Sequence, residues 1–340
     1  MISKIISEEL VKETQEAIEQ VERITIVAHM GPDGDAVGSS LALYHFLLAI
    51  EKKPVVILPN DFPDFLAWMS GADEILIYEK EQKKANAVFA QSELIFALDF
   101  NSFSRLGPMK NAVITSSARK ILIDHHPGPE YFADVVISHP ELSSTSELVF
   151  RLICRMEKFP KINLACAECI YTGMMTDTGN FSYNSNHQDV YSIIFNLVKI
   201  GLDTNEIYQK VYNTYSSNRL RLMGYCLFKK MKVYSKYQTA LITLTKKELL
   251  LFKYKVGDAE GFVNIPLSIK GVKFSVFMRE DADNIKISFR SQGDFPTNKI
   301  ASELFNGGGH LNASGGESNL SLTETVKKFE AALPDYMESL

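Results

Sequence analysis

The sequence predicts an α/β protein with two domains joined by a helical connector. Its 340 residues exceed the usual size of one domain, and 46% of them are hydrophobic, which is enough for sizeable cores. In the N-terminal half, nearly continuous apolar runs alternate with helical stretches, which indicates a parallel sheet with helices on both faces. Beyond residue 225 the β-type runs alternate between apolar and polar residues, as in a half-exposed sheet. We therefore expect domains over 1–188 and 225–340 and a connector over 189–224.

The elements of the first domain follow from its periodicity and its turn signals. An amphipathic helix over 7–22 precedes a strand over 24–28, and a helix over 41–50 follows the next loop. Ser144 and Glu147 have the spacing of a capping box, which marks the start of a helix. Other strands are expected over 54–58, 75–78, 94–98, 121–123 and 135–137, and other helices over 62–69, 144–157 and 164–175.

The second domain mixes strands with helices. Strands are expected over 239–244, 272–278 and 285–290, and helices over 298–305 and 322–333. A Gly-Gly-Gly-His segment ends at His310, directly after the first of these helices. Taken alone, this segment could be a helix C-cap followed by a loop. The pattern therefore indicates a smaller α/β domain.

Composition and charge exclude several classes of protein. The net charge is −5 and there is no long basic run, so we expect no binding of long DNA tracts. Cys166 and Cys169 are spaced as a CxxC pair, but with no second pair they are better explained as small buried helix residues than as a zinc or redox site. No signal peptide and no apolar run of about 20 residues is visible, so we expect a cytoplasmic protein without membrane contact.

Histidines and aspartates gather where the predicted strands and helices end. They are His29, Asp33, Asp35, Asp99, Asp124, His125, His126 and Asp177. Because the carboxyl ends of parallel strands meet at one edge of a sheet, we expect these side chains to share one crevice. In isolation, Asp33 and Asp35 could merely shape a turn and cap a helix. The recurrence of the pattern along the chain favours a site.

Several carboxylates that lie this close together repel one another unless positive charge lies between them. Divalent metal ions are the usual source, and the donors suffice for two ions that share one bridging aspartate. Oxygen ligands with some imidazole and no thiolate favour manganese, with magnesium, cobalt or iron as substitutes. Two such ions activate water and hold the oxygens of a displacement at phosphorus.

Several motifs, in order along the chain, resemble those of the DHH family of phosphoesterases. The family motif stands here as Asp124-His125-His126. Before it come the segment from His29 to Ser39 and then Asp99 at the end of an apolar run. After it come the segment Asp177 to Phe181 and the Gly-Gly-Gly-His segment, which resembles the signature of the family's associated substrate-binding domain. The resemblance covers nearly the whole chain.

The resemblance implies a role for each matching position of the first domain. It implies one metal ion on His29, Asp33 and Asp99, and a second on Asp35, Asp99, His125 and Asp177. It makes Asp99 the bridge and places His126 against the substrate, where it stabilises the phosphate or protonates the leaving oxygen. Asp124 would orient a histidine of the motif.

For the second domain, the resemblance implies contacts to a substrate phosphate. The residues concerned are Arg290, Gly307, Gly308, Gly309 and His310. Glycines let the backbone approach a phosphate closely, and a planar guanidinium suits a phosphate better than an ammonium does. By itself Arg290 could equally pair with a surface carboxylate.

The resemblance further implies a two-domain phosphodiesterase in which a metal-bound hydroxide attacks phosphorus. Size and architecture are most similar to bifunctional enzymes that hydrolyse short 5′-phosphorylated oligoribonucleotides to mononucleotides and convert pAp to AMP. A homodimer is compatible with this interpretation.

Other functions remain open. They include a phosphodiesterase for linear or cyclic dinucleotides, a RecJ-like exonuclease, a pyrophosphatase or exopolyphosphatase, and a non-catalytic nucleotide-binding protein. RecJ exonucleases are usually longer, and family II pyrophosphatases lack the Gly-Gly-Gly-His pattern. A decayed enzyme would have lost ligands, whereas every expected ligand is present here.

Overall fold

The computed structural model describes residues 3–338 and divides the chain into two compact units. The division falls between Thr214 and Tyr215, within the stretch expected to connect the domains. The helices α7 (Gln188–Ile200) and α8 (Thr204–Tyr212) belong to unit 1, and α9 (Ser217–Tyr225) belongs to unit 2.

Unit 1 contains a six-stranded parallel sheet, which confirms the predicted fold class. Its strands are β1 (Arg23–Val27), β2 (Lys53–Leu58), β3 (Leu76–Ile77), β4 (Leu94–Leu98), β5 (Arg119–Asp124) and β6 (Val135–Ser138). Their order is β3-β2-β1-β4-β5-β6. The central strands are buried because helices cover both faces, which explains their continuous apolar runs.

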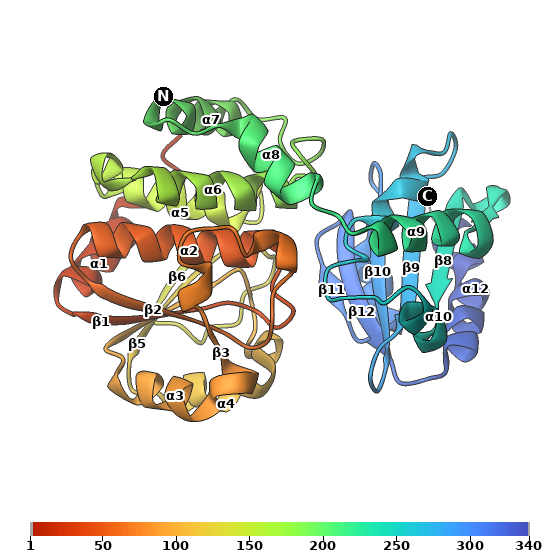
Figure 1. Cartoon of the computed structure of the whole chain (residues 1–340), viewed down its shortest axis with the longest axis horizontal. Coiled ribbons are helices and arrows are strands. Elements are labelled where there is room, and N and C mark those ends of the chain that lie inside the picture. The colour runs from red at the N-terminus through yellow and green to blue at the C-terminus, as the bar shows by residue number, and fades with distance from the viewer. Residues whose placement is uncertain (1–2, 339–340) are drawn as a thin grey trace. The chain divides into compact units, whose positions relative to one another are not determined.

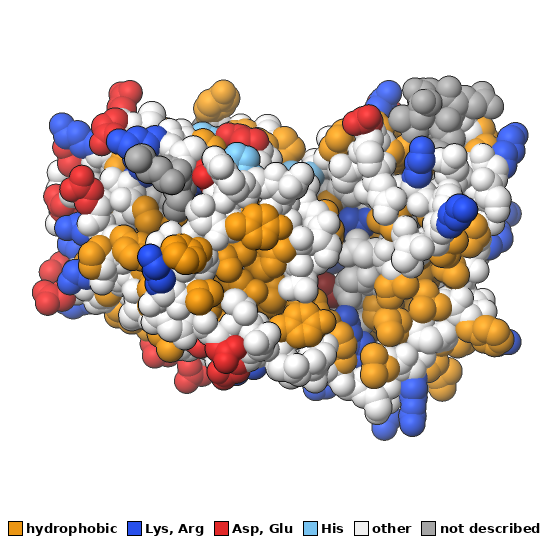
Figure 2. All heavy atoms as spheres, turned by 90° about the horizontal axis from the view of Figure 1, so that it is seen from above, with side chains coloured by type: hydrophobic (Ala, Val, Ile, Leu, Met, Phe, Trp, Pro, Cys, Tyr) orange, Lys and Arg blue, Asp and Glu red, His pale blue; other side chains and the backbone are white. Residues whose placement is uncertain are grey.

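The helices of unit 1 form a layer on each side of this sheet (Figure 1). One layer contains α1 (Glu8–Glu19), α2 (Gly34–Ala49), α5 (Thr145–Arg155) and α6 (Leu164–Asp177), and the other contains α3 (Tyr78–Gln91) and α4 (Lys110–Thr115). The buried Val190, Ile193 and Leu197 of α7 pack onto the first layer. Tyr191 and Phe195 on the same helix are exposed, and hydrophobic side chains gather on this outer face of unit 1 (Figure 2).

Some expected elements of unit 1 differ from those observed. The helix α2 begins at Gly34 rather than Leu41, because the Asp33 carboxylate accepts N–H groups of the first turn and starts the helix early. The segment expected as a helix over 62–69 contains only a short 3₁₀ turn, η1 (Asp64–Leu66). Ser144 caps α5, but the Glu147 carboxylate accepts from Ser143 rather than from Ser144, so the capping box is incomplete.

Cys166 and Cys169 are fully buried in α6. Burial raises the pKa of the Cys166 thiol to about 12. Both side chains therefore pack in the core, as expected.

Unit 2 contains a mixed sheet of order β11-β12-β10-β9-β8-β7. Its strands are β7 (Lys232–Tyr234), β8 (Thr239–Leu244), β9 (Phe274–Glu280), β10 (Ile285–Ser291), β11 (Gly308–Gly309) and β12 (Ala313–Ser318). The helices α11 (Thr297–Leu304) and α12 (Leu322–Glu338) pack on one face, while α9, α10 (Lys246–Leu251) and the 3₁₀ turn η7 (Phe262–Ser268) supply the apolar cluster on the other. Across residues 3–338 no helix combines the length and the hydropathy that a membrane span requires.

Candidate metal centre

The register of the sheet in unit 1 brings His29 and Asp99 together. Val27 of β1 is paired with Ala97 of β4, so the residues that follow the two strands emerge side by side. The strand order reverses between β1 and β4, and ligands of open α/β sheets bind at such a point. Asp99 has a φ of 64°, a left-handed conformation that Asp tolerates better than most residues.

The first group of donors consists of His29, Asp33 and Asp99. His29 Nε2 lies 3.4 Å from Asp99 Oδ2 and 3.9 Å from Asp33 Oδ1. One ligand atom of each residue lies within 4.8 Å of the others. His29 and Asp99 are buried, whereas Asp33 is half-buried. Asp33 thus caps α2 and also faces the site, so the two interpretations of this residue are compatible.

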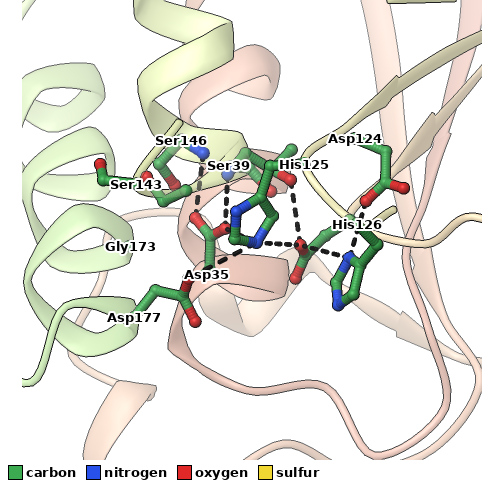
Figure 3. A network of polar contacts seen from close by, with 12 residues as sticks. Asp35, Ser39, Asp124, His125, His126, Ser143, Ser146, Gly173 and Asp177 are labelled. Atoms are coloured by element: carbon green, nitrogen blue, oxygen red, sulfur yellow. Dashed lines mark hydrogen bonds and ion pairs between the residues drawn. The ribbon is translucent and has the colours of Figure 1, made fainter. Parts of the chain in front are cut away.

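The second group surrounds His125 (Figure 3). His125 Nε2 lies 3.4 Å from Asp177 Oδ2, 3.6 Å from Asp99 Oδ1 and 3.9 Å from Asp35 Oδ2. Asp35, His125 and Asp177 also offer ligand atoms within 4.8 Å of one another. Asp99 therefore faces His29 with one carboxylate oxygen and His125 with the other.

The N-terminus of α5 orients two of these carboxylates. The main-chain N–H groups of Thr145 and Ser146 donate to Asp35, at 2.6 Å and 2.9 Å. The Thr145 hydroxyl donates to Asp99 Oδ1 at 3.0 Å. Thr145 and Ser146 were not among the predicted site residues, although a run of small hydroxyl residues before a helix is a signal for such contacts.

His126 and Asp124 form a pair beside these groups. His126 Nδ1 lies 2.8 Å from Asp124 Oδ1 and 3.7 Å from Asp99 Oδ1. Burial lowers the pKa of His126 to about 3 and raises the pKa of Asp124 to about 6. At neutral pH His126 is therefore uncharged, and its Nδ1–H donates to the Asp124 carboxylate. Asp124 Oδ2 accepts no hydrogen bond from the described residues.

Without metal, this cluster takes up protons. Burial and the charge of Arg105 lower the pKa of His29, but the contacts with Asp33 and Asp99 outweigh them and raise it to about 9. Burial also lowers the pKa of His125, and the surrounding carboxylates raise it to about 9. Burial and the neighbouring Asp99 raise the pKa of Asp35 well above its usual range. The site therefore requires positive charge, and its oxygen and imidazole donors suit hard or borderline divalent cations.

Two helices cross closely behind the site at glycines. A Cβ at Gly173 of α6 would clash with Ser146 Oγ and would lie 2.8 Å from Asp35 Oδ1 (Figure 3). A Cβ at Gly38 of α2 would lie 2.9 Å from the backbone of Gly173. The absence of both side chains lets α2 present Asp35 to the N-terminus of α5.

The residues expected to bind substrate in unit 2 lie at one side of its sheet. Arg290 is on β10, opposite Ala313 of β12, and the main-chain N–H of His310 donates to the Ala313 carbonyl at 2.8 Å. Arg290 Nε is buried and has no hydrogen-bond partner among the described residues. Gly308 and Gly309 form the short strand β11, and a Cβ at Gly307 would clash with the Gly315 carbonyl. The missing side chain at Gly307 therefore allows close backbone packing, and Gly308 and Gly309 pair with β12 as a short strand.

Comparison with known proteins agrees with this architecture. Residues 23–174 match the DHH family N-terminal domain, and residues 247–339 match the DHHA1 domain. A bifunctional oligoribonuclease and PAP phosphatase of Thermus thermophilus is 30% identical over 97% of this chain and 94% of its own length. The chain belongs to the DHH family of phosphoesterases.

Two further relatives also match most of the chain. The bifunctional oligoribonuclease and PAP phosphatase of Bacillus subtilis is 26% identical over 86% of this chain and 88% of its own length. A crystal structure of an exopolyphosphatase-related protein from Bacteroides fragilis is 55% identical, covers 99% of each chain and superposes with a TM-score of 0.94.

Proposed function

We propose that this DHH phosphoesterase hydrolyses short 5′-phosphorylated oligoribonucleotides and removes the 3′-phosphate of pAp. The observation that carries the proposal is the pair of histidine–carboxylate groups that share Asp99. The substrate class is supported by the names of the two relatives that match most of the chain. The net charge of −5 is consistent with a short substrate.

The donor groups fit two divalent cations, and we assign manganese as the preferred ion. His29, Asp33 and Asp99 would hold one ion, and Asp35, Asp99, His125 and Asp177 the other. When bound, such ions activate a water molecule and neutralise phosphate charge. The protein fixes the donors before binding, because Asp35 is already hydrogen-bonded by the N-terminus of α5.

His126 is the residue we assign to the reacting phosphate. Its Nδ1 is engaged by Asp124, so Nε2 is the ring nitrogen that we assign to the phosphate. The lowered pKa of His126 makes it neutral in the absence of substrate, and the negative charge of a phosphate would favour its protonated form. Protonated His126 would then donate to the phosphate or to the leaving oxygen.

In unit 2, Arg290 and His310 are the residues we assign to a second phosphate of the substrate. The buried guanidinium nitrogen of Arg290 retains hydrogen-bonding capacity, and a phosphate oxygen would satisfy it. The backbone of Gly307, Gly308 and Gly309 carries no side chain that would hinder an approaching phosphate. Metal binding is thus assigned to unit 1 alone, while residues of both units are assigned to phosphate groups of the substrate.

An assay of RNA length tests the proposal. The manganese-loaded protein is given pAp and 5′-phosphorylated RNA of 2, 5 and about 20 nucleotides, and mononucleotide release is followed. We expect turnover of pAp and of the dinucleotide, loss of turnover with chelator, and kcat/KM that falls with length. A kcat/KM that rises with length would contradict the assignment of short substrates.

A second candidate is a phosphoanhydride hydrolase. The solved relative from Bacteroides fragilis is described as exopolyphosphatase-related. Hydrolysis of polyphosphate in preference to pAp would favour this candidate and would leave the metal assignment intact.

A further inference from the structure

A buried ion network lies behind the N-terminus of α5. The Arg151 guanidinium lies 2.6 Å from Glu147 Oε1 and 3.1 Å from Asp189 Oδ2 of α7. All three side chains are at most 2% exposed. Arg151 also donates to the carbonyl and hydroxyl oxygens of Ser3, at 3.1 Å each. None of these residues belongs to the two groups of metal donors.

The network reaches the metal centre through the second oxygen of Glu147. Arg151 occupies Oε1, while Glu147 Oε2 accepts from the main-chain N–H of Ser143 at 3.0 Å and from its hydroxyl at 2.6 Å. The turn that begins at Ser143 leads directly into the N–H groups of Thr145 and Ser146. These N–H groups hold Asp35, and the Thr145 hydroxyl holds Asp99.

We propose that Arg151 is a positioning residue for the metal centre, acting through Glu147 and Ser143 on the turn that orients Asp35 and Asp99. This inference rests on the metal assignment of the proposed function. Residues that orient metal ligands typically change metal affinity by about 10- to 100-fold when they are removed.

The energetics of burial favour this role over a purely stabilising one. Taking three charged groups out of water is costly, and apolar residues of similar size often give equal or greater stability. A network kept for stability alone would not need a carboxylate oxygen aimed at Ser143. The two oxygens of Glu147 instead join the arginine on one side to the turn on the other.

Arg155 provides a matched control on the same helix. It binds the Ile6 carbonyl and the Glu8 carboxylate, so it also ties the N-terminal segment to α5. Neither of its partners is Glu147 or a residue of the turn from Ser143 to Ser146. Loss of Arg155 should therefore destabilise the protein without disturbing the metal donors.

The test is calorimetric titration of the metal-free full chain with Mn²⁺. Arg151→Met should raise the Kd for Mn²⁺ by about 10-fold or more, while Arg155→Met should leave it within about 2-fold of the wild type. In the loaded enzyme, Arg151→Met should lower kcat for pAp with little change in KM. Equal Kd values for the wild type and the Arg151→Met variant would overturn the inference.

Arg151→Met leaves two buried carboxylates without their positive partner, which could unfold the protein. A second variant therefore separates loss of positioning from loss of stability. The triple variant Glu147→Leu/Arg151→Met/Asp189→Asn removes all three charges and should unfold cooperatively near the wild-type temperature. We expect its Mn²⁺ Kd to stay raised by about 10-fold, because Ser143 has lost its acceptor. A folded triple variant with the wild-type Kd would show that the network serves stability alone. Absence of Mn²⁺ binding by the wild type would overturn the metal assignment itself.

Discussion

Asp124 Oδ1 and His126 Nδ1 lie 2.8 Å apart, within the motif that names the family. The contact occupies Nδ1 of the ring. Asp124 is completely buried, so this contact fixes the orientation of His126 from within the protein.

Asp124→Asn should therefore lower kcat for pAp by about 10- to 100-fold while leaving two manganese ions bound. An asparagine retains the shape of the side chain but lacks the charge that favours the Nδ1–H form of His126. Steady-state kinetics together with metal analysis of the purified variant check this. Wild-type kcat would show that Asp124 does not control His126.

Asp99→Asn should abolish hydrolysis and the binding of both ions, since Asp99 faces both donor groups. Asparagine is preferred to alanine here because it tolerates the φ of 64° at this position. Asp177→Asn is the matched comparison, because Asp177 lies in one group only. Calorimetry should show that Asp99→Asn loses both Mn²⁺ sites and that Asp177→Asn loses one. An active Asp99→Asn enzyme would contradict the bridging role.

Gly173→Ala should weaken Mn²⁺ binding and lower the temperature of unfolding, because the new methyl group would press on Ser146 and Asp35. Gly224→Ala is the control: it lies in α9, has no atom within 4 Å of the new Cβ, and should be neutral or slightly stabilising. The unfolding temperatures of both variants are measured with and without Mn²⁺ and compared with those of the wild type. Equal unfolding temperatures and an equal stabilisation by Mn²⁺ in the two variants would mean that the close crossing of α2 and α6 does not affect the site.

The stability of the metal-free protein should fall as pH rises from 6.5 to above 9. The pKa values of His29 and His125 are raised to about 9 in the folded state, above the ordinary 6.5. Their contribution is therefore fully present below pH 6.5 and is lost as pH rises through 9. Over the same range Mn²⁺ affinity should increase, because fewer protons compete for the imidazoles. A Tm of the metal-free protein that is constant across this range would count against the protonated cluster.

Arg290→Ala should raise KM for pAp by about 10-fold or more and leave Mn²⁺ binding unchanged, since loss of a charged hydrogen bond costs about 1.5–3 kcal/mol. Arg279→Ala is a suitable control, because Arg279 is on the neighbouring strand β9 and pairs with Asp281. A loss of metal in the Arg290 variant would contradict the separation of roles between the two units.

The sequence alone was sufficient to predict the sheet of unit 1 and the gathering of its donors. Apolar runs such as Leu94–Leu98 mark buried strands, and parallel pairing forces the residues that follow them to one edge. His29 and Asp99 could therefore be placed at one edge from the sequence, because parallel pairing alone requires it. Their direct adjacency follows from the pairing of β1 with β4, which the sequence did not predict.

Contacts made by the backbone could not be predicted in the same way. The N–H groups of Thr145 and Ser146 reach Asp35 from 110 or more positions away; the hydroxyl residues mark the start of a helix, but they do not indicate which carboxylate it contacts. The strand β12 (Ala313–Ser318) was missed because its residues have low strand propensity and are placed by pairing with β10. Arg151 and Glu147 are i,i+4 neighbours on α5, but the contacts of Arg151 with Asp189 and Ser3 arise only from packing and could not be read from the sequence.

The proposed substrate class is best tested by giving the manganese-loaded protein pAp, a 5′-phosphorylated RNA dinucleotide, long single-stranded DNA and pyrophosphate side by side. We expect hydrolysis of the first two, abolished by chelator and by Asp99→Asn, and little turnover of the others. Turnover of pyrophosphate or long DNA in preference to pAp and the dinucleotide would contradict it.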